Sequence, residues 1–224
     1  MKELTIESLA HDLRGVAHAD GVVWLVDGAL PAENVLVRER ARYSQRVEAD
    51  VEQVLQASPA RIAPPCEYAS VCGGCDVQYM DYATQLANKE RVLKEQLARI
   101  ENIATVQWLP TLAAEPWAYR RRARIACRWL ADKKHLALGF RQRHSHAIVE
   151  IEHCAILVPA LQALLPSLRQ CLSRWSQPRQ LGHIELLAAD NGIGMLLRVT
   201  AALSPVDQAL LQAFAVEQAV TVFI

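Results

Sequence analysis

The sequence predicts an α+β protein, with a small OB-like β-barrel in residues 1–58 and an α+β domain with an antiparallel sheet in residues 59–224. In the first part, Asp20-Gly21 and Asp27-Gly28 separate short β-rich runs, as expected of tight turns between strands. In the second part, longer β-rich runs alternate with stretches in which leucines recur at helical spacing. The chain has 224 residues, of which 52% are hydrophobic and 21% charged, so it is long enough and apolar enough for two globular domains.

The predicted barrel ends in a strand over residues 47–55, where apolar and acidic residues alternate. Val47, Ala49 and Val51 have one parity, and Glu48, Asp50 and Glu52 have the other. Small barrels of this kind often bind oligonucleotides, although many are scaffolds without that role. Because one face of this strand carries the acidic residues, we expect only weak electrostatic attraction between the strand and a nucleic acid.

The second domain is predicted to contain three helices and one sheet. The first helix covers residues 82–103, with one buried face formed by leucines and an isoleucine. The third begins at Pro205 after the N-cap Ser204. The remaining elements are strands at 120–129, 136–141, 147–151, 183–188, 194–200 and from 220, and a helix at 159–175.

Three cysteines, Cys66, Cys72 and Cys75, lie within ten residues and predict a metal-binding loop. The glycines between the last two let the backbone turn tightly, so that N–H groups can approach thiolate sulfurs. Three thiolates leave one coordination position open. The best candidate for the fourth ligand is Cys154.

The two remaining cysteines have the pattern of core residues. Cys127 shares the apolar parity of a strand with Ile125 and Trp129, and Cys171 follows Leu168 on the apolar side of a helix. The spacing of the other four favours an iron–sulfur cluster, because structural zinc sites usually combine two short cysteine pairs. Zinc, a redox-active role and an incidental grouping remain open. A disulfide framework is disfavoured in a chain of this size without a signal peptide.

The net charge of the chain is zero, but residues 120–143 contain nine basic residues and one acidic residue. Such a local cationic strip is typical of a surface that contacts a phosphate backbone, and a solvated strand face is the alternative. Flanking aromatic residues could stack on unpaired bases. The predicted RNA-binding residues are Arg120, Arg122, Arg124, Arg128, Arg141, Arg143, Tyr119 and Phe140.

The sequence has no apolar run of the roughly 20 residues that a bilayer-spanning helix needs. We therefore expect a cytoplasmic protein without a membrane partner, and a monomer. The apolar ending Val222-Phe223-Ile224 suggests that the chain stops inside a structural element, as in a truncated protein.

Several motifs together resemble the bacterial RNA uracil-C5 methyltransferases, and among them those that modify 23S ribosomal RNA. The resemblance covers essentially the whole chain. It rests on Cys66-x5-Cys72-Gly73-Gly74-Cys75, Pro116-Trp117-x-Tyr119-Arg120-Arg121-Arg122, Gly139-Phe140-Arg141, Cys154-x-Ile156-Leu157, and Leu181-Gly182-His183-Ile184-Glu185-Leu186.

The resemblance implies an N-terminal TRAM domain, a [4Fe–4S] cluster held by Cys66, Cys72, Cys75 and Cys154, and 23S ribosomal RNA as partner. It implies S-adenosylmethionine as the cofactor of the full-length enzyme. We expect this chain to be the N-terminal half only, truncated before a Rossmann-like methyltransferase domain, with no catalytic residue and no activity by itself. The alternative is a stand-alone RNA-binding iron–sulfur or zinc protein without enzyme activity.

Overall fold

The computed structural model describes residues 1–100 and 106–224, which form two compact units. One unit contains Met1–Pro64 and Asp76–Ala114, and the other contains Pro65–Cys75 and Glu115–Ile224. This division differs from the predicted boundary after residue 58, because the region of the first helix groups with the N-terminal strands. Met80 is fully buried beside Leu9 and Leu30, which explains the grouping.

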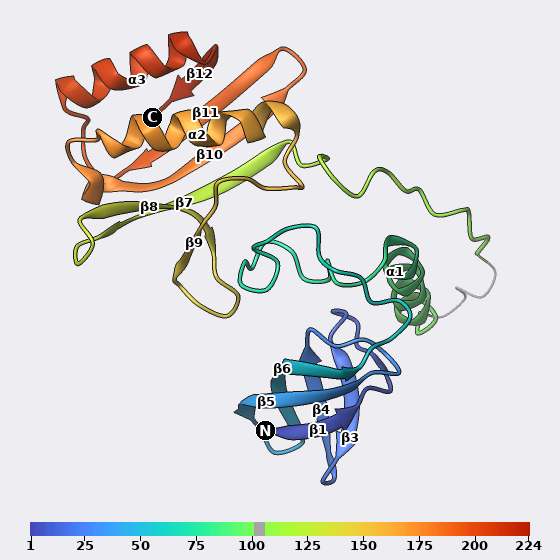
Figure 1. The fold of residues 1–224 in the computed structure, drawn as a ribbon. Helices are drawn as coiled ribbons and strands as arrows, with labels where there is room; N and C mark the ends of the chain where they lie inside the picture. The colour runs from blue at the N-terminus through green and yellow to red at the C-terminus, as the bar shows by residue number, and fades with distance from the viewer. Residues whose placement is uncertain (101–105) are drawn as a thin grey trace. The chain divides into compact units, whose positions relative to one another are not determined.

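The first unit is built around a six-stranded sheet with the order β1-β5-β6-β4-β3-β2 (Figure 1). Its edge strands β1 and β2 are separated in the chain by Ile6 and Glu7 alone, so the chain itself joins the two edges and curls the sheet into a barrel. The strands are β1 Lys2–Thr5, β2 Ser8–Leu9, β3 Gly15–Ala19, β4 Val22–Asp27, β5 Asn34–Arg42 and β6 Arg46–Gln56.

The turn between β3 and β4 is formed by Asp20 and Gly21, as the sequence predicts. Both have positive φ, 53° and 73°, which is the backbone of a type I′ turn and matches the twist of a hairpin. Gly28, with φ of 89°, ends β4. The two Asp-Gly pairs therefore determine where the chain turns after β3 and after β4.

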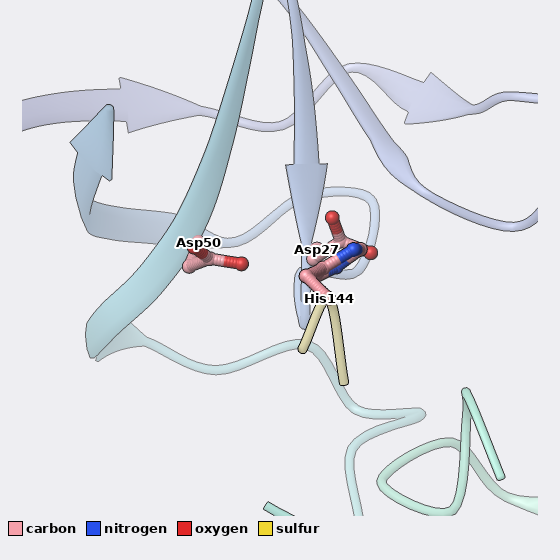
Figure 2. Close-up of side chains that lie close together, drawn as sticks. All are labelled: Asp27, Asp50 and His144. Carbon is pink, nitrogen blue, oxygen red and sulfur yellow. The ribbon is translucent and has the colours of Figure 1, made fainter. Parts of the chain in front are cut away.

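The acidic side chains of β4 and β6 are neutralised within the barrel. Asp27 and Asp50 are register partners on these parallel strands, and Figure 2 shows their side chains. The Arg40 guanidinium donates to both carboxylates, at 2.9 Å from Asp27 and 2.5 Å from Asp50. It also lies 3.5 Å from Glu48. Arg40 thus pairs with two of the three acidic residues that alternate along β6, Glu48 and Asp50.

A buried carboxylate ties the barrel to the segment that follows it. The Glu33 side chain is completely buried and accepts hydrogen bonds from the Arg61 guanidinium and from the backbone N–H groups of Leu30 and Ser58. Burial opposes ionisation of Glu33, but these donors outweigh it and hold its pKa below the usual value. The carboxylate is therefore charged and fully paired.

Helix α1, Tyr82–Leu97, is shorter than predicted. Asp81 caps it by accepting a hydrogen bond from the Thr84 N–H at 2.9 Å. Residues 101–103 of the predicted helix lie outside the described residues. Within the helix itself no residue is buried, so the expected buried face is absent from the described structure.

The second unit contains a six-stranded sheet with the order β12-β11-β10-β7-β8-β9 (Figure 1). The prediction of an antiparallel sheet was wrong at one edge, because β12 runs parallel to β11. A parallel pair needs a crossover connection, which helix α3 supplies. The elements are β7 Arg122–Leu130, β8 His135–Arg141, β9 Ile148–Glu150, α2 Pro159–Ser173, the 3₁₀ turn Pro178–Gln180, β10 Leu181–Ala189, β11 Gly192–Val199, α3 Pro205–Glu217 and β12 Val220–Phe223.

Helices α2 and α3 lie side by side on one face of this sheet (Figure 1). The covered face carries alternate residues of each strand, such as Ile125, Ile184 and Met195, which pack against Leu168 and Phe214 of the helices. Within the described residues of this unit, no helix lies on the opposite face. No helix in the described ranges is long and apolar enough to cross a membrane.

We predict that Arg61→Met destabilises the first unit by about 3–5 kcal/mol, because it leaves the Glu33 carboxylate buried without its cation. The measurement is urea unfolding followed by circular dichroism. Arg38→Met is the matched control, since Arg38 pairs with Glu52 at the surface and such pairs contribute roughly 0–1 kcal/mol. Because the pKa of Glu33 is lowered, its contribution is present above the unfolded-state pKa and is lost as pH falls through the folded-state pKa. Equal unfolding midpoints for the two variants at neutral pH would contradict this account.

Candidate metal centre and nucleic-acid interface

The cysteine loop, residues 65–75, docks on the segment that follows β8. The Gly73 N–H donates to the Arg141 carbonyl at 2.9 Å, and the Arg143 N–H donates to the Val71 carbonyl at 3.0 Å. Cys72 thereby forms an isolated antiparallel bridge with Gln142. A Cβ at Gly73 would lie 3.1 Å from the Arg141 carbonyl oxygen, so the close approach favours glycine there.

The side chain of Arg143 fastens the same loop. Its Nη2 donates to the Cys75 carbonyl at 2.7 Å, while its buried Nε finds no hydrogen-bond acceptor among the described residues. Arg143 was predicted to contact RNA. Its guanidinium lies against the loop, where the buried Nε is left for an additional acceptor.

The fourth cysteine is brought to the loop by contacts around Tyr68. The Tyr68 hydroxyl accepts a hydrogen bond from the Glu152 N–H at 3.2 Å, and its ring lies 5.5 Å from that of His153. Cys154 follows directly, and its N–H donates to Gln162 of α2 at 2.7 Å. The structure therefore holds Cys154 in place through two separate elements.

Cys66 and Cys75 lie close enough to both Cys72 and Cys154 to disfavour the ionisation of those two thiols. Burial raises the pKa of Cys72, and the neighbouring Cys75 and Cys66 add to this effect. Burial likewise raises the pKa of Cys154, to which Cys75 and Cys66 also contribute. The Gly74 N–H points at the Cys72 sulfur at 3.4 Å and favours its thiolate. A metal ion would supply the positive charge that four neighbouring thiolates need.

The spacing of these thiols bears on the choice of metal. Tetrahedral zinc with Zn–S bonds of about 2.3 Å holds its sulfurs about 3.8 Å apart. Among the described residues, no three of the cysteine sulfurs lie within 4.8 Å of one another. A four-iron cluster binds each thiolate at a different iron, so it fits a wider set of sulfurs.

The other two cysteines are core residues, as the sequence predicts. Cys127 and Cys171 both belong to the hydrophobic core of the second unit. Burial raises the pKa of Cys127 to about 12 and that of Cys171 to about 11. Both thiols are therefore protonated at neutral pH and are poor metal ligands.

The arginine strip alternates along β7 as predicted, with Arg122, Arg124 and Arg128 exposed and the intervening residues directed to the core. Arg122 and Arg124 donate to the two oxygens of Glu185 on β10, at 2.6 and 2.7 Å. Their side chains stay 71% and 66% exposed, whereas that of Glu185 is 13% exposed. Hydrogen bonds from Arg122 and then Arg124 lower the pKa of Glu185 to about 2.

The other predicted RNA contacts are dispersed around the second unit. The Arg120 backbone pairs with the segment before α2, and Arg141 Nη1 lies 2.6 Å from His146 Nδ1. Tyr119 is exposed, and Phe140 packs against the hydrophobic core. Phe140 is therefore poorly placed to stack on a base.

Arg121 of the strip pairs with Asp190 and also donates to the Ala188 carbonyl. Two neighbours of the strip were not predicted. Glu185 and Arg198 join the same surface from β10 and β11. Their alternation with buried leucines was visible in the sequence, but their position opposite β7 was not.

The chain is similar in sequence to bacterial 23S rRNA methyltransferases. No protein-family model matches the chain. It is 42% identical over 219 residues to the 23S rRNA (uracil(1939)-C(5))-methyltransferase RlmD of Histophilus somni, an alignment that covers 98% of this chain and 50% of the relative. It is 46% identical over 213 residues to RlmD of Pseudomonas savastanoi, covering 95% of this chain and 47% of the relative. The similarity is to RNA uracil-C5 methyltransferases. The chain spans about half the length of the curated relatives it matches.

A solved structure shares the fold. The tRNA (uracil-54, C5)-methyltransferase of Pyrococcus abyssi, in complex with S-adenosyl-L-homocysteine, matches with a TM-score of 0.66 and 21% identity. The match covers 93% of this chain and 48% of that chain. The fold seen here is thus found in a methyltransferase.

These matches correct three predictions. The chain was expected to be only the N-terminal half of an RlmD-type enzyme, to lack a methyltransferase fold, and to serve as a non-catalytic RNA-binding iron–sulfur fragment. The relatives are methyltransferases matched over at least 95% of this chain, and the structural neighbour is a methyltransferase bound to S-adenosyl-L-homocysteine. The predictions that this chain is only a non-catalytic N-terminal half and that it lacks a methyltransferase fold were therefore wrong.

We predict that the side-chain carboxyl of Glu185 titrates near pH 2, because two guanidinium groups stabilise its charged form. The measurement is the pH dependence of its ¹³C carboxyl chemical shift. In the Arg122→Gln/Arg124→Gln variant the pKa should return toward that of an ordinary glutamate. An unchanged low pKa in this variant would show that another group holds the carboxylate.

Proposed function

We propose that this chain is part of an S-adenosylmethionine-dependent enzyme that methylates carbon 5 of a uracil in 23S ribosomal RNA. The observation that carries the proposal is its identity of 42% and 46% to two RlmD enzymes over almost its whole length. The cationic surface of the second unit supports an RNA substrate, because arginines are the usual partners of backbone phosphates. A cytoplasmic location, a monomeric state and the assignment of the barrel as a TRAM domain remain predictions.

Methylation at carbon 5 requires that the enzyme gain access to the target uracil. Carbon 5 of a uracil stacked inside a helix is hard to reach, so the enzyme needs the RNA locally unpaired with its bases turned outward. The arginines of the second unit, Arg122, Arg124 and Arg128 foremost, suit the task of gripping the backbone on either side of such a base. S-adenosylmethionine would supply the methyl group.

We also propose that Cys66, Cys72, Cys75 and Cys154 bind a [4Fe–4S] cluster, with zinc as the second candidate. Two features support it: Cys66 and Cys75 disfavour ionisation of both Cys72 and Cys154, so the four side chains lie near one another, and the Gly74 N–H points at the Cys72 sulfur. Such a cluster would cross-link the cysteine loop to the segment before α2. Gln162 and Tyr68 would keep Cys154 in position for it.

The proposed activity is tested by deleting the gene that encodes this chain. We expect one 5-methyluridine to disappear from 23S ribosomal RNA, as measured by mass spectrometry of nuclease digests, and to return when the gene is supplied on a plasmid. Purified protein with tritium-labelled S-adenosylmethionine should then methylate 23S RNA from the deletion strain and leave RNA from the parent strain unlabelled. An unchanged 5-methyluridine content after deletion would refute the proposal.

The metal centre is tested with two cysteine variants. We predict that protein purified without oxygen is brown and contains about four iron and four sulfide per chain, as one cubane requires. Cys154→Ser should lose most of this iron and the broad visible absorption, because a serine hydroxyl does not replace a thiolate. Cys171→Ser is the matched control, since Cys171 is a core residue, and it should retain the cluster. Stoichiometric zinc with little iron in the parent protein would favour the second metal.

A further inference from the structure

The sheet of the second unit has an open face on the side away from α2 and α3. The register of the strands places alternate residues side by side on it: Arg124 opposite Glu185, Glu185 opposite Leu196, and Leu196 opposite Phe223. The open face is formed by Arg122, Arg124 and Arg128 of β7, His183, Glu185 and Leu187 of β10, Gly194, Leu196 and Arg198 of β11, and Phe223 of β12.

One part of the open face is apolar. Leu187, Leu196 and Phe223 are 46%, 41% and 56% exposed, and they are neighbours across three adjacent strands. The Phe223 ring lies over Gly194, where a Cβ would be 3.8 Å from its Cε2 atom. The absence of a side chain at Gly194 leaves room for this ring, and Phe223 remains 56% exposed. Contiguous exposed apolar groups of this kind mark a binding surface.

The other part of the open face is cationic. Arg122, Arg124, Arg128 and Arg198 are exposed, and Glu185 is the carboxylate among them, so the face carries a surplus of three positive charges with His183 neutral. Glu185 holds two of the arginines side by side without hiding them, since each remains at least 66% exposed. Both side chains are therefore accessible to an anion from solvent.

We propose that the open face binds a single-stranded segment of the RNA substrate, with phosphates on the arginines and a base stacked on Phe223. This inference rests on the proposed function and deepens it by naming the surface and the form of RNA. Charge complementarity selects a polyanion, and the apolar patch selects one with exposed base faces, which a duplex hides. The arginines of the open face can bind the phosphates of such a strand, and Phe223 can stack on one of its bases.

The experiment measures binding of a fluorescein-labelled, uridine-rich single-stranded RNA of about 12 nucleotides, in the range of such binding sites, to the full chain by fluorescence anisotropy at several salt concentrations. Arg198→Gln should weaken binding and reduce the slope of log affinity against log salt by about 0.7, the share of one phosphate contact. Phe223→Ala should weaken binding about 5- to 100-fold, the effect of one lost stacking contact, without changing the slope.

Arg174→Gln is the matched control. Arg174 is exposed and loses the same charge, but it follows α2, which covers the opposite side of the sheet, so binding should equal that of the parent. Phe223→Leu keeps an apolar side chain without the aromatic ring and should bind as weakly as Phe223→Ala, which separates stacking from a folding defect. Circular dichroism checks that each variant is folded.

Three results would overturn the proposal or its stacking part. If the parent binds the RNA and both Arg198→Gln and Phe223→Ala bind equally well, the RNA lies elsewhere, and the proposed methylation, tested by gene deletion, is unaffected. If the parent binds no single-stranded RNA at low salt, the open face has another occupant, such as a protein surface. An RNA duplex should bind with no sensitivity to Phe223→Ala, and an equal loss for duplex and single strand would refute base stacking.

Discussion

The docking of the cysteine loop on residues 141–143 is the interaction on which the proposed metal centre depends. Two backbone hydrogen bonds, which form the bridge between Cys72 and Gln142, act together with the Arg143 guanidinium. They hold a loop that has no regular secondary structure of its own. A loop with three thiols would otherwise be free to collapse or oxidise. Because β8 also belongs to the central sheet, the sheet and the cysteine site are held by the same backbone.

The net charge of zero conceals two different uses of charge. In the barrel, arginines and carboxylates are arranged to cancel, as around Arg40, and the buried pair of Glu33 and Arg61 is fully hydrogen-bonded. On the open face of the second sheet lie four arginines and one glutamate, and two of the arginines pair with that glutamate. The ion pairs of the barrel contribute to its stability. The surplus positive charge on the open face is available to bind a phosphate backbone.

Glu185 has a particular place in this balance. A carboxylate on a phosphate-binding surface is expected to weaken binding, yet its two oxygens hold Arg122 and Arg124 in fixed neighbouring positions. Fixing two long side chains before the RNA arrives reduces the conformational entropy lost on binding. The two arginine side chains stay 71% and 66% exposed, so the carboxylate orders them without burying them.

Local chemistry in the sequence determined the Asp20-Gly21 turn, the alternation of arginines along β7 and the start of α3 at Ser204, because each depends on a few adjacent residues. The division of the six cysteines into a loop set and core residues was also readable from spacing and parity. Tertiary structure alone decided that Glu185 lies opposite Arg124, that Phe223 covers Gly194, and that β12 runs parallel to β11. These contacts join strands through register and crossover, and the pattern of any single segment is the same whichever neighbour it pairs with. For the same reason α1 could be predicted as a helix but not assigned to the barrel unit, since that depends on the burial of Met80 beside Leu9 and Leu30.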